Sequence, residues 1–304
     1  MSLLTALPIA RFDPRRRLRA YTGNWHRPGR FGVWGLLLVF VLWSLVGPIS
    51  AVRGPARPLY DDFNGPAGSP PDPRLWSYDM DAGWSKEQQS YTRLVENIHQ
   101  NGSGHLVITA ARAPDGSYTS ARIKTQNKLN MGYGRVEASI MMPPGPGVLP
   151  AFWLLGSDYP SVGHPACGEI DIVEYVRSVF HFTLYGPQQG ESDYRPTDTC
   201  GPTRVSGWQV SRWQVPDFDP AAGFHTYWAE RSLDRITIGV DDVTTAVFTP
   251  DSLPAGGTWV FNDKLMFAII SFAVGSDVSW PGPPDATIPF SQVMRVDWFR
   301  YTPA

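Results

Sequence analysis

Short runs of alternating apolar and polar residues recur along the chain after residue 58, and Gly, Pro, Asn or Asp residues separate them. Alternation with a period of two is typical of half-buried β-strands, and no stretch of useful length there has the 3.6-residue period of a helix. Many short strands with regular turns indicate an all-β sandwich, and roughly 245 residues suit one domain of that class. Strands are predicted at 105–112, 134–142, 151–156, 168–175, 180–186, 264–275 and 294–302, with a hairpin at 224–242 that turns at 232–235.

The segment GEIDIVEY, residues 168–175, places three carboxylates in a stretch that otherwise has the pattern of a buried strand. Asp and Glu are uncommon in strands and are rarely buried without a partner. Glu169 and Asp171 alternate with isoleucines and therefore share one face, whereas Glu174, at an odd offset, would face the opposite way in a regular strand. One extra residue in a β-bulge near Val173 would return Glu174 to the same face, and such bulges often lie beside active sites.

Two carboxyl groups on one open surface are the minimum that glycoside hydrolysis requires. One attacks the sugar or activates water, and the other protonates the departing oxygen. Carboxylates this close cannot all be ionised at neutral pH, so one keeps its proton and can serve as the acid. The alternative is an edge strand with solvated acids, which the apolar alternate positions and the neighbouring aromatic residues disfavour.

The first 51 residues differ sharply from the rest of the chain. Residues 1–30 carry seven Arg and one acidic residue, and residues 31–51 carry no charge at all. A basic lead followed by an apolar run is typical of a signal peptide or of a membrane anchor, and the two alternatives stay open. Residues 52–58 then form a Pro-rich linker to a catalytic domain at 59–304, which we expect outside the cytosol, extracellular or in the cell envelope.

Charge and cysteine content narrow the class of partner and the compartment. Leaving out residues 1–51 leaves 19 basic and 27 acidic residues, a net charge of −8, which disfavours nucleic acid as a partner. The two cysteines, Cys167 and Cys200, both lie in the exported part, and an oxidising compartment favours a disulfide between them over two buried thiols. The sequence has no zinc-type Cys/His spacing and no phosphate-binding glycine loop after a strand.

The segment PACGEIDIVEY closely resembles the active-site strand of glycoside hydrolase family 16, whose pattern is E-[apolar]-D-x-x-E. It is most similar to the bacterial laminarinase (endo-β-1,3-glucanase) branch, which carries the bulge residue. LYDDFNG, GWSKEQQSYT, FHTYWAE and MRVDWFRY match in order through most of residues 59–302. The resemblance implies a curved antiparallel jelly-roll β-sandwich, concanavalin A-like, with a cleft across its concave sheet. It also implies Glu169 as nucleophile, Asp171 as its modulating partner and Glu174 as acid/base.

The resemblance further implies aromatic platforms for sugar rings. Trp153 and Trp280 match family positions that line the cleft, Trp84 is a weaker candidate, and His181 matches a histidine that could bond a substrate hydroxyl. Core packing is the alternative for each of these side chains.

No cofactor is expected for catalysis, but some relatives hold a structural calcium. Asp62 and Asp297 fall in the two terminal strands where that ion is held. Calcium takes six to eight oxygen ligands, and two acids do not supply them.

Several positions depart from the family pattern near the sugar-binding face, while the three acids are intact. We therefore expect the chemistry to be preserved and leave the polysaccharide open. The first hypothesis is a monomeric, secreted or membrane-tethered endo-β-1,3- or β-1,3-1,4-glucanase. The second is a hydrolase or transglycosylase acting on another polysaccharide, such as a galactan or an envelope glycan, and the third is a non-catalytic glycan-binding jelly roll. The departures are His164 for Trp, Tyr185 for a second His, Ser85-Lys86 for an Asn pair, Ile270-Ser271 for Leu-Asn and Ser276 for Gly.

Overall fold

The computed structural model describes residues 55, 57–80, 86–143, 145–188, 207–284 and 291–304. The predicted signal peptide or anchor at 31–51 lies outside these residues, as do Trp84 and Cys200. Within the described ranges, no helix is long and apolar enough to cross a membrane.

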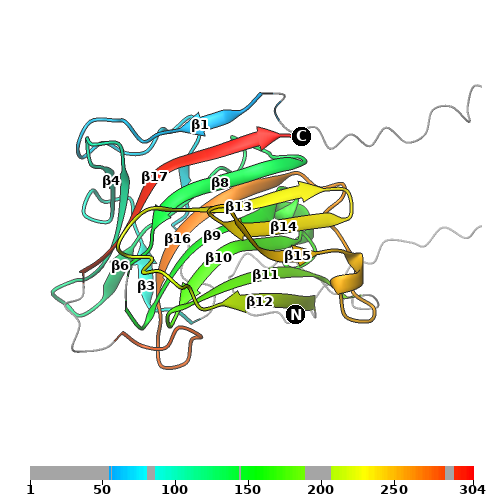
Figure 1. Cartoon of the computed structure of the whole chain (residues 1–304). Coiled ribbons are helices and arrows are strands. Elements are labelled where there is room, and N and C mark those ends of the chain that lie inside the picture. The colour runs from blue at the N-terminus through cyan, green and yellow to red at the C-terminus, as the bar shows by residue number, and fades with distance from the viewer. Residues whose placement is uncertain (1–54, 56, 81–85, 144, 189–206, 285–290) are drawn as a thin grey trace, which may run out of the picture. The chain divides into compact units, whose positions relative to one another are not determined.

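Two β-sheets form the domain, and their strands run side by side as curved ribbons (Figure 1). The larger sheet holds, in spatial order, β15 (Val243–Phe248), β14 (Arg235–Val240), β13 (His225–Ser232), β8 (Gly134–Met141), β17 (Ser291–Pro303), β5 (Leu106–Arg112), β6 (Tyr118–Ser120) and β3 (Gln89–Tyr91), with β1 (Leu59–Asp61) on β17 and β4 (Ile98–Gln100) on β5. The smaller sheet holds β12 (Gly207–Gln214), β11 (Val179–Pro187), β10 (Glu169–Val176), β9 (Val148–Gly156), β16 (Met266–Val274), β7 (Arg122–Lys124) and β2 (Ser77–Tyr78).

The core lies between the two sheets, because alternate residues of each strand point inward. Phe152 of β9 meets Phe299 of β17 edge to face, with ring centroids 6.2 Å apart. A second apolar group, including Trp153, Leu155 and Phe267, covers the opposite face of β9 and β16. Burial on both faces explains why these two strands have nearly continuous apolar sequences.

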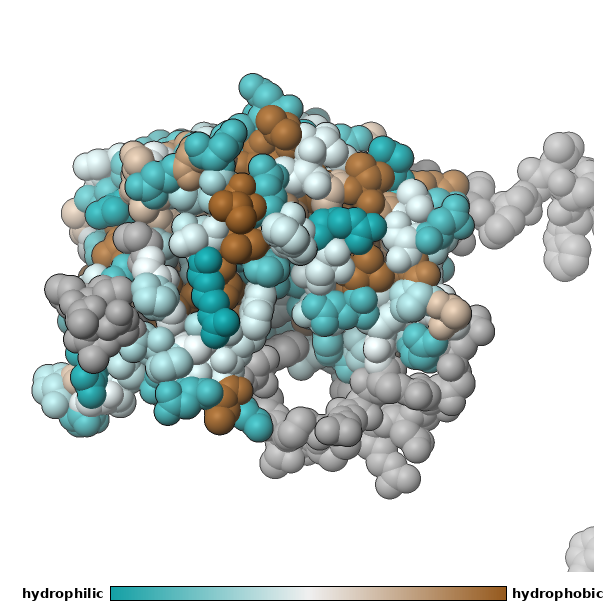
Figure 2. Space-filling view, turned by 60° about the horizontal axis from the view of Figure 1, so that its bottom comes forward, coloured by the Kyte–Doolittle hydropathy of each residue, from teal (hydrophilic) through white to brown (hydrophobic). Residues whose placement is uncertain are grey.

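Polar side chains dominate the outer surface that Figure 2 shows. Apolar residues form small separate groups there among polar ones. The described helical elements are short, namely α2 (Tyr159–Val162) and the 3-10 turn η1 (Pro250–Ser252), so strands and the loops between them position the site.

The predicted all-β sandwich is confirmed, as are the long strands and the hairpin, whose two strands end at Ser232 and begin at Arg235. Two features were not predicted. Strands β12 and β15 and most of the shortest strands lack a clear apolar pattern, and β3 pairs with β6 in parallel rather than antiparallel.

Candidate active site

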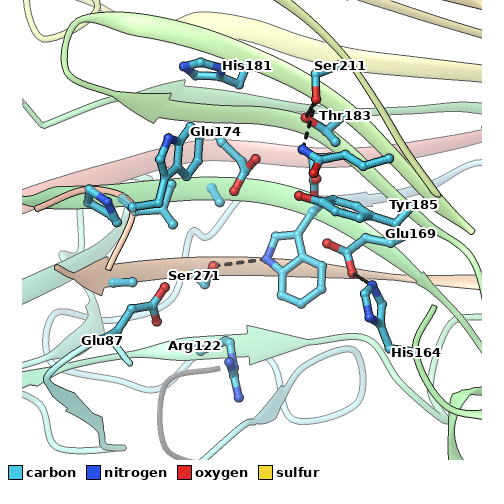
Figure 3. A pocket seen from close by; sticks show the side chains of 18 of the residues that line it. Glu87, Arg122, His164, Glu169, Glu174, His181, Thr183, Tyr185, Ser211 and Ser271 are labelled. Carbon is cyan, nitrogen blue, oxygen red and sulfur yellow. Dashed lines mark hydrogen bonds and ion pairs between the residues drawn. The ribbon is translucent and has the colours of Figure 1, made fainter. Parts of the chain in front are cut away.

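A bulge in β10 brings the three acids to one face of the smaller sheet. The pairing of β10 with β11 shifts register between Asp171 and Glu174, and its pairing with β9 shifts between Asp171 and Val173. Ile172 and Val173 both point into protein and are fully buried. The bulge predicted near Val173 is therefore confirmed, and all three carboxyl groups line one cavity of about 470 Å³ (Figure 3).

The neighbouring strands extend this face by direct pairing. Tyr185, Thr183 and His181 of β11 lie opposite Glu169, Asp171 and Glu174, respectively. Residues directly opposite in adjacent strands have side chains on the same face. Residues on one face of five neighbouring strands thus line the cavity. They are Trp153, Ala151 and Leu149 of β9, the three acids of β10, the three β11 residues, Gln209 and Ser211 of β12, and Ser271 and Ala273 of β16.

Burial and mutual repulsion raise the pKa of two of the acids. Burial raises the pKa of Glu174 from 4.5 to about 8, with further increases from the charges of Glu169 and Glu87. Burial also raises the pKa of Asp171 well above its ordinary value, as do the charges of Glu174 and Glu169 and a hydrogen bond with Glu169. At neutral pH Glu174 therefore keeps its proton and is available as a proton donor.

Glu169 has a basic partner that the sequence did not reveal. His164 Nε2 approaches Glu169 Oε2 to 2.9 Å, and the imidazole ring lies 5.7 Å from the ring of Tyr185 (Figure 3). Burial lowers the pKa of His164, but the hydrogen bond with Glu169 and the charge of that carboxylate outweigh burial, so the pKa is raised overall. His164 thus holds one oxygen of the Glu169 carboxylate.

A fourth acid, Glu87, also lines the cavity (Figure 3). Its Oε2 accepts a hydrogen bond of 3.0 Å from Gln89 Nε2. Burial raises the pKa of Glu87, and the Gln89 hydrogen bond and the charge of Arg122 lower it by less. Arg122 in turn lies over the ring of Tyr91, with its guanidinium carbon 4.6 Å from the ring centroid.

Three of the predicted sugar-binding residues line the cavity. Trp153 is only 8% exposed and donates a hydrogen bond of 3.0 Å from its indole nitrogen to Ser271 Oγ, so it forms part of the floor. Trp280 is 46% exposed and meets the ring of His181 edge to face at 4.8 Å. Burial lowers the pKa of His181, which makes it a neutral hydrogen-bonding group at pH 7. Trp84 lies outside the described residues.

The calcium prediction concerns the two terminal strands, and the disulfide prediction concerns Cys167, two residues before Glu169. Asp62 and Asp297 both lie near enough to Tyr60 to raise its pKa, although burial contributes most. Among the described residues, no three His, Cys, Asp or Glu side chains cluster to hold a metal ion, so calcium would need mainly backbone oxygens. Cys167 is buried, and its predicted partner Cys200 lies outside the described residues, so the disulfide stays a prediction.

Sequence reasoning missed His164 as a partner of Glu169 and gave no role to Glu87, Gln209 or Ser211. The spacing of five residues between His164 and Glu169 was visible, but only the turn before β10 places the two side chains together. Glu87 lies in the family-like segment GWSKEQQSYT, which was given no role in the site, and no local pattern marks Gln209 or Ser211.

A two-sheet jelly roll with several carboxyl groups in one cavity has the groups that a glycoside hydrolase, an enzyme that cleaves O-glycosyl bonds, needs for its chemistry. The family model for glycosyl hydrolases family 16 matches residues 84–299, and the chain belongs to that family. The chain is 37% identical to the beta-glucanase of Rhodothermus marinus over 87% of this chain and 92% of that protein.

Two solved structures share the fold. The endo-beta-1,3-glucanase of Pyrococcus furiosus is 33% identical over 80% of this chain and 93% of its own, with a TM-score of 0.66. The laminarinase catalytic domain of Thermotoga maritima is 31% identical over 81% of this chain and 97% of its own, also with a TM-score of 0.66.

Proposed function

We propose that the chain is a retaining endo-β-glucanase that hydrolyses β-1,3-glucan or mixed β-1,3-1,4-glucan. The observation that carries this proposal is the bulged strand β10, which presents Glu169, Asp171 and Glu174 to one cavity. The relatives supply the substrate class, since their names are beta-glucanase, endo-beta-1,3-glucanase and laminarinase.

In the first step Glu169 attacks the anomeric carbon of the sugar. A bond forms between that carbon and a Glu169 oxygen, and the bond to the glycosidic oxygen breaks with its electron pair on the departing oxygen. Glu174 gives its proton to that oxygen, because its pKa of about 8 keeps it protonated at neutral pH. His164 holds Glu169 through the 2.9 Å contact at Oε2, which orients the carboxylate for attack.

In the second step water cleaves the glycosyl-enzyme ester. Glu169 has lost its negative charge by forming the ester, and that charge was the second cause, after burial, of the raised pKa of Glu174. The pKa of Glu174 therefore falls, and its carboxylate can accept a proton from the attacking water. The same residue thus acts first as acid and then as base, while Asp171 moderates the charge beside Glu169 through their hydrogen bond.

A panel of polysaccharides with chromatography of the products tests the substrate class. We expect oligosaccharides from β-1,3-glucan or mixed-linkage glucan. Products from a galactan or an envelope glycan alone would favour the second hypothesis, and binding without products would favour a glycan-binding jelly roll.

Two substitutions test the catalytic roles. Glu169→Gln and Glu174→Gln remove an ionisable group with little change of volume, so each should abolish most turnover and leave the circular dichroism spectrum unchanged. Azide should partly rescue Glu174→Ala, because it can occupy the vacated space and attack the ester. Near-wild-type activity of Glu169→Gln would exclude Glu169 as the nucleophile.

We also propose that residues 1–51 export the domain, as a cleaved signal peptide or a retained anchor, and that the domain acts as a monomer without a catalytic cofactor. The seven Arg of residues 1–30 and the uncharged segment 31–51 support export. N-terminal sequencing of the protein in the medium and in the membrane fraction would distinguish cleavage from retention. Calcium titration in a thermal-unfolding assay would test for the ion at Asp62 and Asp297.

A further inference from the structure

Strand β12, at the edge of the smaller sheet, carries an exposed tryptophan on the active-site face. Its pairing with β11 places Gln209 opposite Tyr185, Ser211 opposite Thr183 and Trp213 opposite His181. Gln209 and Ser211 line the catalytic cavity, and Trp213 is the next residue on the same face. Trp213 is 69% exposed, although Trp208 of the same strand is 3% exposed.

The two tryptophans of β12 differ in what they do for the fold. Trp208 faces the core, where its ring lies 6.2 Å from that of Phe261, and its indole nitrogen donates to the carbonyl of Thr258 at 3.2 Å. In the described part of the chain, no aromatic ring packs against Trp213. A tryptophan usually stabilises a fold by burying its large apolar surface. Because the Trp213 indole is mostly in water, it contributes little of this stabilisation, and the fold does not explain a tryptophan at this position.

Trp213 extends a row of residues that runs across the strands on the catalytic face. Glu174, His181 and Trp213 are successive direct partners on β10, β11 and β12. Two strand spacings, about 10 Å, separate the strand of Glu174 from that of Trp213. Trp280 packs edge to face on His181, so exposed aromatic side chains stand both at the cavity and at the edge of the sheet.

The groups beside Trp213 indicate the kind of ligand. Thr183 Oγ1 and Ser211 Oγ lie 3.1 Å apart, and Gln209 Nε2 donates to Ser211 Oγ at 3.1 Å, which gives a row of neutral hydroxyl and amide groups. Aromatic rings beside neutral polar groups suit an uncharged sugar, whose C–H face can cover the indole while its hydroxyls find hydrogen-bond partners.

We propose that Trp213 is a binding platform for a sugar unit of an uncharged polysaccharide, remote from the bond that is cleaved. This inference rests on the proposed function of the same cleft and extends it to the edge strand. A short oligosaccharide that fills only the catalytic cavity does not reach Trp213, whereas a polymer does.

The test compares Trp213→Ala with wild type on a soluble β-1,3-glucan polymer and on an aryl β-disaccharide. For the polymer we expect KM to rise about 3- to 10-fold with kcat unchanged, and for the disaccharide we expect no change. Trp213→Phe keeps an aromatic ring and should retain most of the affinity. Tyr60→Ala is the control, because Tyr60 is 55% exposed on β1 of the other sheet, and it should leave both substrates unaffected.

An unchanged polymer KM in Trp213→Ala would overturn the proposal. An equal rise for polymer and disaccharide would also overturn it, because it would show a disturbance of the catalytic cavity through His181. If wild type cleaves another neutral polysaccharide instead of β-glucan, the proposed substrate is wrong. In that case the role of Trp213 is tested by comparing the KM of Trp213→Ala and of wild type on that polysaccharide and on a short substrate derived from it.

Discussion

Glu87 offers a direct test of how the site sets the protonation of Glu174. Three causes raise the pKa of Glu174 from 4.5 to about 8, and they are burial, the charge of Glu169 and the charge of Glu87, in decreasing order. Since all three act in the same direction, the smallest supplies at most a third of the increase. Replacing Glu87 with uncharged Gln should therefore lower the pKa of Glu174 by no more than about one pH unit.

The lower pKa of Glu174 in Glu87→Gln should shift the pH dependence of activity in one direction. Glu174 must be protonated to act as the acid, so activity falls as the pH rises through its pKa. In Glu87→Gln this fall should begin at lower pH than in wild type. Gln keeps the volume of Glu, and its amide oxygen can still accept the hydrogen bond from Gln89, so the cavity should keep its shape.

The assay is kcat/KM on β-glucan as a function of pH, which reports the pKa values of the free enzyme. Glu230→Gln is the control, because Glu230 is exposed on β13 of the other sheet and should leave the profile unchanged. A basic limb that stays in place in Glu87→Gln, or that moves to higher pH, would show that the charge of Glu87 does not act on Glu174.

Three further predictions follow from the site and the core. Proton NMR during early hydrolysis of a β-glucan should show the β-anomer first, and initial release of the α-anomer would contradict a covalent intermediate on Glu169. Phe152→Ala should lower the free energy of unfolding by about 3–5 kcal/mol in urea, because Phe152 is fully buried; a loss below about 1 kcal/mol would contradict the packing against Phe299. Mass spectrometry of unreduced peptides should find Cys167 linked to Cys200, whereas two freely alkylated thiols would exclude the bridge.

The sequence predicted the acids and the bulge because both depend on a local pattern. Glu169 and Asp171 alternate with buried isoleucines, and the odd offset of Glu174 demands one extra residue whatever the rest of the fold does. The long buried strands were predicted from an equally local pattern, since short apolar runs between turn residues, such as the run in β16, are typical of strands inside a sheet.

The parts that escaped prediction depend on contacts between distant segments. Glu87 precedes β3 and reaches Glu174 only after the sheets have formed. The alternation in β12 is weak because an edge strand has less to bury, so its two tryptophans could not be assigned to opposite faces. His164 was recognised as a departure from the family pattern, but its contact with Glu169 depends on the path of the loop.

The alternation along β10 also restricts how the chain can misfold. Ile170, Ile172 and Val173 face the core, and the three acids face the cleft. If β10 paired one residue out of register with β9 or β11, every side chain would change faces, and carboxyl groups would enter the apolar interior. The high cost of burying them disfavours every slipped pairing. The acids that the reaction needs therefore also protect the assembly of the sheet, and a variant that neutralises them should fold with less discrimination between registers.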